Sequence, residues 1–260
     1  MTDTTGTTDR PDVLDGWERA SFTAAGFEHD TYRRGSGPGV VVIHEIPGIT
    51  PTVIDFANDV VDRGFTVVMP DLVGTPGKPV SMPYTLASLA KVCVSKEITA
   101  WALNSTTPIT PWLRALARRL HDEVGGPGVG AVGMCFSGGF ALGMMVDDIM
   151  LAPVLSQHSF PMARGSGDAS GNLGLSPDDE AAIIERAQHG CQVLGLRFVG
   201  DKMVGTRFDT LREKLGDAFI AVELPSTSRR DHSVLTEQRD EPSVQRVLDF
   251  LAEKLLTPET

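Results

Sequence analysis

The chain has 260 residues, of which 41% are hydrophobic, 22% charged and 6% aromatic. This composition is typical of a globular protein and excludes collagen-like, coiled-coil and intrinsically disordered chains. The 23 Lys and Arg against 34 Asp and Glu give a net charge of −11. Nucleic acid is therefore not expected as a partner, because a phosphate backbone binds a basic face.

Cysteine usage and hydropathy indicate the compartment. Three cysteines are too few for a disulfide framework, and no CxxC pair indicates a zinc site. The N-terminus lacks the basic start and apolar run of a signal peptide. The longest apolar stretches, such as residues 40–43, are far shorter than the roughly 20 residues that span a bilayer. We expect a cytoplasmic protein with free thiols and no membrane association.

Residues 1–20 are polar and unpatterned, and we predict a polar N-terminal arm followed by a single domain over residues 21–260. In that domain, short apolar runs alternate with segments of helical periodicity. The predicted strands are 39–44, 65–69, 129–134, 149–155, 192–199 and 218–224. The predicted helices are 51–63, 112–124, 136–145, 177–189, 208–215 and 242–255. This alternation predicts an α/β fold with a mostly parallel sheet and helices on both faces.

The segment 76–110 departs from this alternation. Prolines separate its short apolar stretches, so it fits a lid-like excursion over a pocket better than a core element. Residues 159–176 are rich in Gly and Ser, which favours a surface loop.

The sequence Gly133-Met-Cys135-Phe-Ser-Gly138-Gly139 lies between a predicted strand and a predicted helix. Small residues two positions before and after Cys135 allow the sharp turn of a nucleophile elbow. A helix N-terminus also favours a thiolate. Free cysteines are often buried for packing alone. By itself, the motif supports a nucleophile and a structural cysteine about equally.

Two further polar side chains follow predicted strands. Asp201 follows Gly200 just after the strand 192–199, and His232 lies in the loop after the strand 218–224. Each alone has a plainer interpretation, a helix cap for Asp201 and a surface residue for His232. However, the carboxyl ends of parallel strands meet at one edge of a sheet, where Cys135 is also expected. The chain order of nucleophile, acid and base is that of α/β-hydrolases, and the sequence therefore predicts a catalytic triad.

The sequence resembles the dienelactone hydrolase family from about residue 27 to residue 255. The resemblance is most specific at the segments 43–48, 70–72, 133–139, 200–201 and 232–233. It implies an α/β-hydrolase fold and hydrolysis of small esters or lactones through a thioester intermediate. In this family the elbow cysteine is the nucleophile, here Cys135, with Asp201 as the acid and His232 as the base.

The resemblance also assigns the residues around the nucleophile. Glu45 falls on the glutamate that contacts the nucleophile and controls its protonation. The backbone N–H groups of Ile46 and Phe136 fall on the oxyanion hole, where two donors converge on the developing charge. Glu45 follows a histidine, but Gly48 breaks the HExxH pattern of a zinc site. Neither a metal nor an organic cofactor is expected.

The sequence departs from the family at two positions. The best-known members bind the carboxylate of a dienelactone with two arginines, and these positions hold Thr75 and Thr236 here. Because threonine offers no charge-assisted pair, we expect a neutral ester or lactone as the small-molecule substrate, with Thr75 and Thr236 as candidate substrate-binding residues. Arg229 and Arg230 are alternative sources of positive charge. A thioesterase, a non-catalytic ligand-binding protein of the same fold and a homo-oligomer all stay open.

Overall fold

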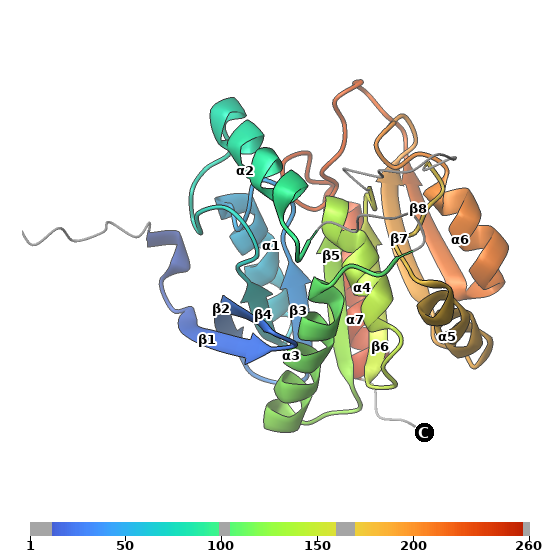
Figure 1. Ribbon diagram of the computed structural model, residues 1–260, viewed down its shortest axis with the longest axis horizontal. Helices are drawn as coiled ribbons and strands as arrows, with labels where there is room; N and C mark the ends of the chain where they lie inside the picture. Colours follow the sequence, from blue (N-terminus) through green and yellow to red (C-terminus); the bar gives the residue numbers. More distant parts are fainter. Residues whose placement is uncertain (1–11, 99–104, 160–169, 257–260) are drawn as a thin grey trace, which may run out of the picture.

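A sheet of eight strands forms the centre of the molecule (Figure 1). The computed structural model describes residues 12–98, 105–159 and 170–256. In chain order, the strands are β1 (Glu18–Ala24), β2 (Phe27–Gly35), β3 (Gly39–Ile43), β4 (Thr66–Pro70), β5 (Val129–Met134), β6 (Met150–Ser156), β7 (Val193–Phe198) and β8 (Phe219–Leu224). Their spatial order is β1-β2-β4-β3-β5-β6-β7-β8. Strands β3 to β8 run parallel, whereas β2 pairs antiparallel with both β1 and β4.

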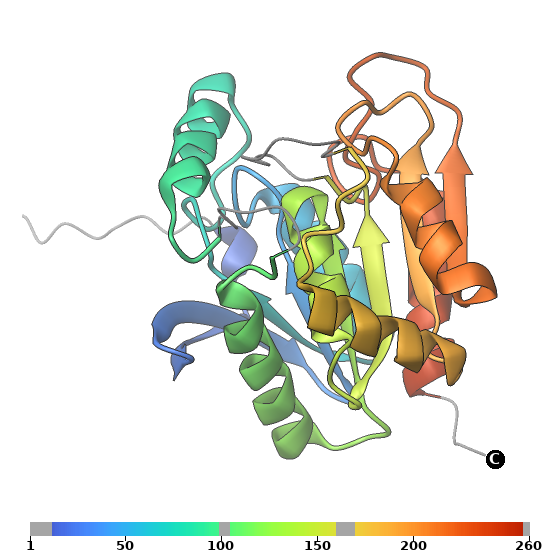
Figure 2. The same ribbon diagram turned by 45° about the vertical axis from the view of Figure 1, so that its right-hand side comes forward.

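Helices cover both faces of this sheet (Figure 2). They are α1 (Pro51–Asp62), α2 (Met82–Val94), α3 (Ile109–Val124), α4 (Gly138–Met144), α5 (Pro177–Gln188), α6 (Arg207–Leu215) and α7 (Glu241–Leu255). Helices α1 and α7 pack on one face, and α3, α4, α5 and α6 pack on the other. The predicted mostly parallel sheet with helices on both faces is confirmed. None of these helices is both long and apolar enough to cross a bilayer.

The central strands are apolar throughout because both of their faces are covered. All five residues of β3 are buried. Val41 and Ile43 point into the core beneath α3 and α4, while Val40 and Val42 point into the core beneath α1 and α7. Each such side chain contributes roughly 1.5–3 kcal/mol by leaving water. The boundaries of the predicted strands and helices lie within three residues of the observed boundaries.

The antiparallel edge of the sheet is not predicted from the sequence. Strands β1 and β2 are joined by a two-residue turn, in which Ala25 and Gly26 have φ angles of 49° and 83°. Most β1 side chains are exposed, so the strand lacks the apolar run that marks the central strands. The predicted arm also ends earlier than residue 20, because Leu14 and Trp17 are buried and β1 begins at Glu18. Residues 1–11 of that arm lie outside the described residues.

The segment 76–110 contains one complete helix, α2, and the start of α3. Pro83 and Pro111 lie in the first turns of these helices, where the missing N–H group costs nothing. Helix α3 therefore begins three residues earlier than predicted. Residues 99–104 of this segment and 160–169 of the predicted surface loop lie outside the described residues. A lid-like role for 76–110 stays a prediction.

Candidate active site

Cys135 lies in a sharp turn between β5 and α4. Its φ angle is +57°, a left-handed conformation that residues other than glycine rarely adopt. The turn is tight, because a Cβ atom on Gly133 would lie only 2.3 Å from the carbonyl oxygen of Ser137. The Ser137 hydroxyl accepts a hydrogen bond from the Met134 N–H at 2.8 Å and donates to the carbonyl of Ile43 at 3.0 Å. The turn is thus held against β3, with Cys135 5% exposed.

Asp201 and His232 approach this turn from the loops that follow β7 and β8. The His232 Nδ1 atom lies 2.6 Å from the Asp201 Oδ2 atom, and the Asp201 side chain is only 4% exposed. The second carboxylate oxygen accepts a hydrogen bond from the Met203 N–H at 2.9 Å. The structure therefore brings together the acid and base predicted from the sequence and points them at the Cys135 turn.

The electrostatic environment of His232 favours its charged form. Burial tends to lower the pKa of His232, but the interactions with Cys135 and Asp201 outweigh it and raise this pKa to about 11. The buried Nε2 atom has no hydrogen-bond partner within the described residues. An imidazole held by a carboxylate at Nδ1 and open to a thiol at Nε2 is arranged to exchange a proton with that thiol.

Glu45 is a buried carboxylate that follows β3. It accepts hydrogen bonds from the Thr236 hydroxyl, from the Ser233 hydroxyl at 2.7 Å and from the Gln157 amide at 3.1 Å. Burial raises the pKa of Glu45 despite these donors. Two of the three donors belong to the loop that carries His232, so Glu45 ties this loop to the end of β3. Within the described residues, Glu45 makes no hydrogen bond to Cys135.

The two residues predicted to form an oxyanion hole, Ile46 and Phe136, lie in the segments that follow β3 and β5. Phe136 is in the first turn after β5, where N–H groups have no acceptor within the helix. Ile46 follows Glu45, and its N–H group makes no hydrogen bond within the described part of the chain. Its loop packs closely against the loop after β4, because a Cβ atom on Gly74 would lie 2.2 Å from the Pro47 carbonyl oxygen.

With this geometry in place, the comparisons with known proteins identify the family. The model of the dienelactone hydrolase family matches residues 29–254. The chain belongs to the dienelactone hydrolase family. Among the curated proteins, none matches this sequence significantly.

Solved structures share the fold. A protein from Klebsiella pneumoniae subsp. pneumoniae assigned as a dienelactone hydrolase is 19% identical with a TM-score of 0.64, and the match covers 92% of this chain and 97% of that one. A dienelactone hydrolase-like promiscuous phosphotriesterase from metagenomic libraries is 16% identical with a TM-score of 0.63, covering 92% and 98%. A thioesterase domain from the curacin biosynthetic pathway is 11% identical with a TM-score of 0.57, covering 92% and 100%. The predicted α/β-hydrolase fold is confirmed.

The two threonines that stand at the family's arginine positions have different surroundings. Thr236 is buried, and its hydroxyl is engaged by Glu45. Thr75 is exposed, and its N–H donates to the Tyr84 hydroxyl at 2.6 Å. Arg229 and Arg230 are exposed on the histidine loop. Neither threonine brings a positive charge to this member of the dienelactone hydrolase family.

Two residues at the site were missed by sequence reasoning. Gln157 and Ser159 follow β6, and they contact Glu45 and Cys135 respectively, with the Ser159 hydroxyl 3.2 Å from the Cys135 sulfur. The signal that could have found them is the one that found Asp201, a polar residue just after a parallel strand. For Ser159, the Gly- and Ser-rich composition of the segment 159–176 favours a surface loop instead.

Two buried histidines near the site are kept neutral. The His44 Nε2 atom accepts a hydrogen bond from the Leu72 N–H at 3.2 Å while Nδ1 lies 2.8 Å from the Glu45 carbonyl oxygen, and burial lowers the pKa of His44 to about 4. Burial also lowers the pKa of His158 to about 3. Neutral, satisfied His44 is a structural residue of the β3 loop. Within the described residues, no cluster of His, Cys, Asp and Glu is suited to holding a metal ion.

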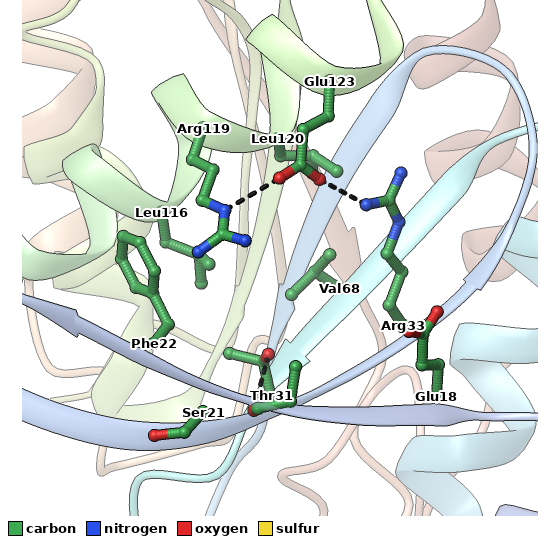
Figure 3. Close-up of a pocket in the computed structure, with 11 residues that line it drawn as sticks. Glu18, Ser21, Phe22, Thr31, Arg33, Val68, Leu116, Arg119, Leu120 and Glu123 are labelled. Carbon is green, nitrogen blue, oxygen red and sulfur yellow. Dashed lines mark hydrogen bonds and ion pairs between the residues drawn. The ribbon is translucent and has the colours of Figure 1, made fainter.

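A separate hollow lies away from this site (Figure 3). It is formed by β1, β2, β4 and α3, with Phe22, Val68 and Leu116 on its walls. Glu123 lies between Arg33 and Arg119 and pairs with Arg33 and, at 2.8 Å, with Arg119. None of the predicted site residues lines this hollow, so it does not belong to the candidate active site.

Proposed function

We propose that the protein hydrolyses small neutral esters or lactones with a Cys-His-Asp triad. The observation that carries this proposal is the 2.6 Å contact between His232 and Asp201 beside the strained turn of Cys135. Membership of the dienelactone hydrolase family supports a hydrolase. The geometry supports Cys135 as the nucleophile, His232 as the base and Asp201 as the residue that orients the base.

The first half of the reaction acylates Cys135. His232 holds the proton of the thiol, and the thiolate attacks the carbonyl carbon of the substrate to form a carbon–sulfur bond. The resulting oxyanion accepts hydrogen bonds from the N–H groups of Ile46 and Phe136. The carbon–oxygen bond then breaks, and His232 gives its proton to the leaving alkoxide. In a lactone, this alcohol remains attached to the acyl group.

The second half releases the acid. A water molecule attacks the thioester carbonyl carbon while His232 removes its proton. The carbon–sulfur bond breaks, and the thiolate of Cys135 is restored beside protonated His232. One ester and one water give one acid and one alcohol, so no cofactor enters the balance. A thioesterase would use the same two steps, with a thiol as the first leaving group.

Glu45 supports the base in this proposal. Its hydrogen bonds to Ser233 and Thr236 hold the loop on which His232 lies, so a shift of this carboxylate would displace the base. The protonation role that the resemblance implies for Glu45 requires a contact with Cys135. The three donors around the carboxylate support the anchoring role instead.

The proposed substrate is neutral because the pocket offers no buried cation at the family's arginine positions. Desolvating a substrate carboxylate without a cation is costly. Arginine at position 75 would point from an exposed site, whereas arginine at 236 would pair with Glu45. We therefore expect Thr75→Arg, compared with Thr75→Gln, to shift kcat/KM towards a carboxylate-bearing lactone over its methyl ester by about tenfold, as one charge-assisted contact would.

The decisive experiment combines turnover with trapping. Native protein is mixed with a neutral aryl ester and with a lactone, quenched in acid and analysed by peptide mass spectrometry. We expect an acyl group on Cys135 and turnover that falls by roughly a thousandfold or more in Cys135→Ala. Cys93→Ala and Cys191→Ala are matched controls that keep turnover. Full turnover in Cys135→Ala would contradict the triad, and no turnover of any ester, lactone or thioester would favour a non-catalytic binding protein.

The proposed reaction needs a free thiol. Cys93, Cys135 and Cys191 are all unpaired, which supports a reducing compartment such as the cytoplasm. Treatment with a mild oxidant should therefore reduce turnover, and a thiol reductant should restore it.

A further inference from the structure

The residues that follow β6 form a side of the site that the triad does not include. Ser159 is 1% exposed. Its hydroxyl lies 3.2 Å from the Cys135 sulfur, and its N–H donates to the Cys135 carbonyl at 3.0 Å. Ser159 thus contacts both the side chain and the main chain of the proposed nucleophile.

The Ser159 hydroxyl has one proton and two acceptors within reach. The carbonyl oxygen of Gln157 lies 3.1 Å from the hydroxyl oxygen, close to the 3.2 Å separation from the Cys135 sulfur. A neutral thiol is a weak acceptor, so the proton then favours the carbonyl. A thiolate is charged and attracts the proton more strongly. The hydrogen bond to sulfur is therefore stronger in the charged form of Cys135.

We infer that Ser159 is a positioning residue that holds the Cys135 sulfur towards His232 and stabilises its thiolate form. A donor that binds the charged form of an acid more tightly than the neutral form favours ionisation. The inference rests on the proposed function only in taking Cys135 as the nucleophile.

The charged and titratable groups around Cys135 come from four strand ends. His232 and Asp201 come from the loops after β8 and β7, Glu45 from the loop after β3, and His158 from the end of β6. Glu45 already accepts three hydrogen bonds, and His158 is neutral. Within the described residues, Ser159 supplies the one hydroxyl that donates to the sulfur.

The geometry makes the side chain of Ser159 removable. The bond from its N–H to the Cys135 carbonyl belongs to the main chain and survives any substitution other than proline. Ser159→Ala therefore removes the donor to sulfur while the strand end stays attached to the elbow. Loss of the hydroxyl and loss of the local fold are thus separable.

The test measures alkylation of Cys135 by iodoacetamide between pH 5 and pH 10. Peptide mass spectrometry reads Cys135 separately from Cys93 and Cys191. In Ser159→Ala, we expect the midpoint of the pH profile to rise by about one pH unit and the rate at pH 6 to fall about tenfold, the effect of losing one hydrogen bond to a charged group. The control is Ser243→Ala, which removes a buried hydroxyl without a hydrogen-bond partner among the described residues and should leave the profile unchanged.

A second pair of variants separates the hydroxyl from packing. Ser159→Thr and Ser159→Val have the same shape, but only threonine keeps the donor. We expect the valine profile to lie about one pH unit above the threonine profile. Equal profiles in this pair, or a native profile in folded Ser159→Ala, would overturn the inference. Alkylation needs no substrate, so a protein that hydrolyses no ester contradicts the proposed function without altering this result.

Discussion

Two histidines follow parallel strands at the same edge of the sheet and have opposite properties. His158, after β6, is buried against α4. A Cβ atom added to Gly138 would lie 2.9 Å from the Cβ atom of His158. Burial, reinforced by nearby Arg207, lowers the pKa of His158 to about 3. His232, after β8, has a pKa of about 11 because Cys135 and Asp201 outweigh its burial. Burial alone keeps an imidazole neutral, and a neighbouring thiol and carboxylate together favour the charged form of an imidazole that is also largely buried.

The largest expected effect is the loss of the base. His232→Gln should lower kcat/KM for a neutral ester by about 10²- to 10⁴-fold, the usual contribution of a general base. His158→Gln removes an imidazole that is even more deeply buried and should keep kcat/KM within about tenfold, because no proton transfer depends on it. Steady-state kinetics of the two purified variants test this contrast. Equal losses in both would show that the two histidines do not differ in function.

Asp201→Asn should reduce the difference in pKa between His158 and His232. An amide keeps the shape of the side chain but removes the Asp201 charge, which together with Cys135 raises the pKa of His232. We expect the pKa of His232 to fall and kcat/KM to fall about ten- to a hundredfold, as for one lost charge-assisted hydrogen bond. Nitrogen NMR of the imidazole measures the titration directly. A variant in which His232 titrates as in the native protein would argue against the role of Asp201.

Glu45→Gln tests what holds the His232 loop in place. The amide group of glutamine would face donors from Ser233, Thr236 and Gln157, leaving at least one of them without an acceptor. We expect the free energy of unfolding to fall by about 1–3 kcal/mol, measured by urea denaturation at pH 7. Unchanged stability together with an altered pH profile of Cys135 alkylation would favour control of protonation over anchoring.

The smallest effect concerns stability in acid. The folded protein keeps His158 neutral, whereas the unfolded chain takes up a proton below its ordinary pKa of 6.5. The stabilisation is therefore present above pH 6.5 and is lost as the pH falls towards 3. Between pH 7 and pH 5, His158 should remove about 2 kcal/mol from the free energy of unfolding. When the pH is lowered from 7 to 5, the free energy of unfolding of His158→Gln, measured by urea denaturation, should fall by about 2 kcal/mol less than that of the native protein. Equal falls in the two proteins would contradict a neutral His158 in the folded state.

The sequence by itself determined the central sheet and the approximate places of three site residues. Strands buried on both faces must be apolar at every position, so β3, β4 and β5 are visible as continuous runs. The turn at Cys135 is visible because only small residues fit beside it. Asp201 and His232 are predictable because parallel strands deliver their following residues to one edge.

The tertiary structure decided the features that depend on partners distant in the chain. The β1–β2 edge carries no apolar run, since it has little burial to require one. Glu45 contacts Ser233 and Thr236, which lie 188 and 191 residues away in the chain, and Ser159 reaches Cys135 through the pairing of β5 with β6. A local pattern reports burial and turns, because these act on neighbouring residues. A polar residue just after a strand shows only which edge of the sheet it reaches, and the packing of the sheet decides which side chain it contacts there.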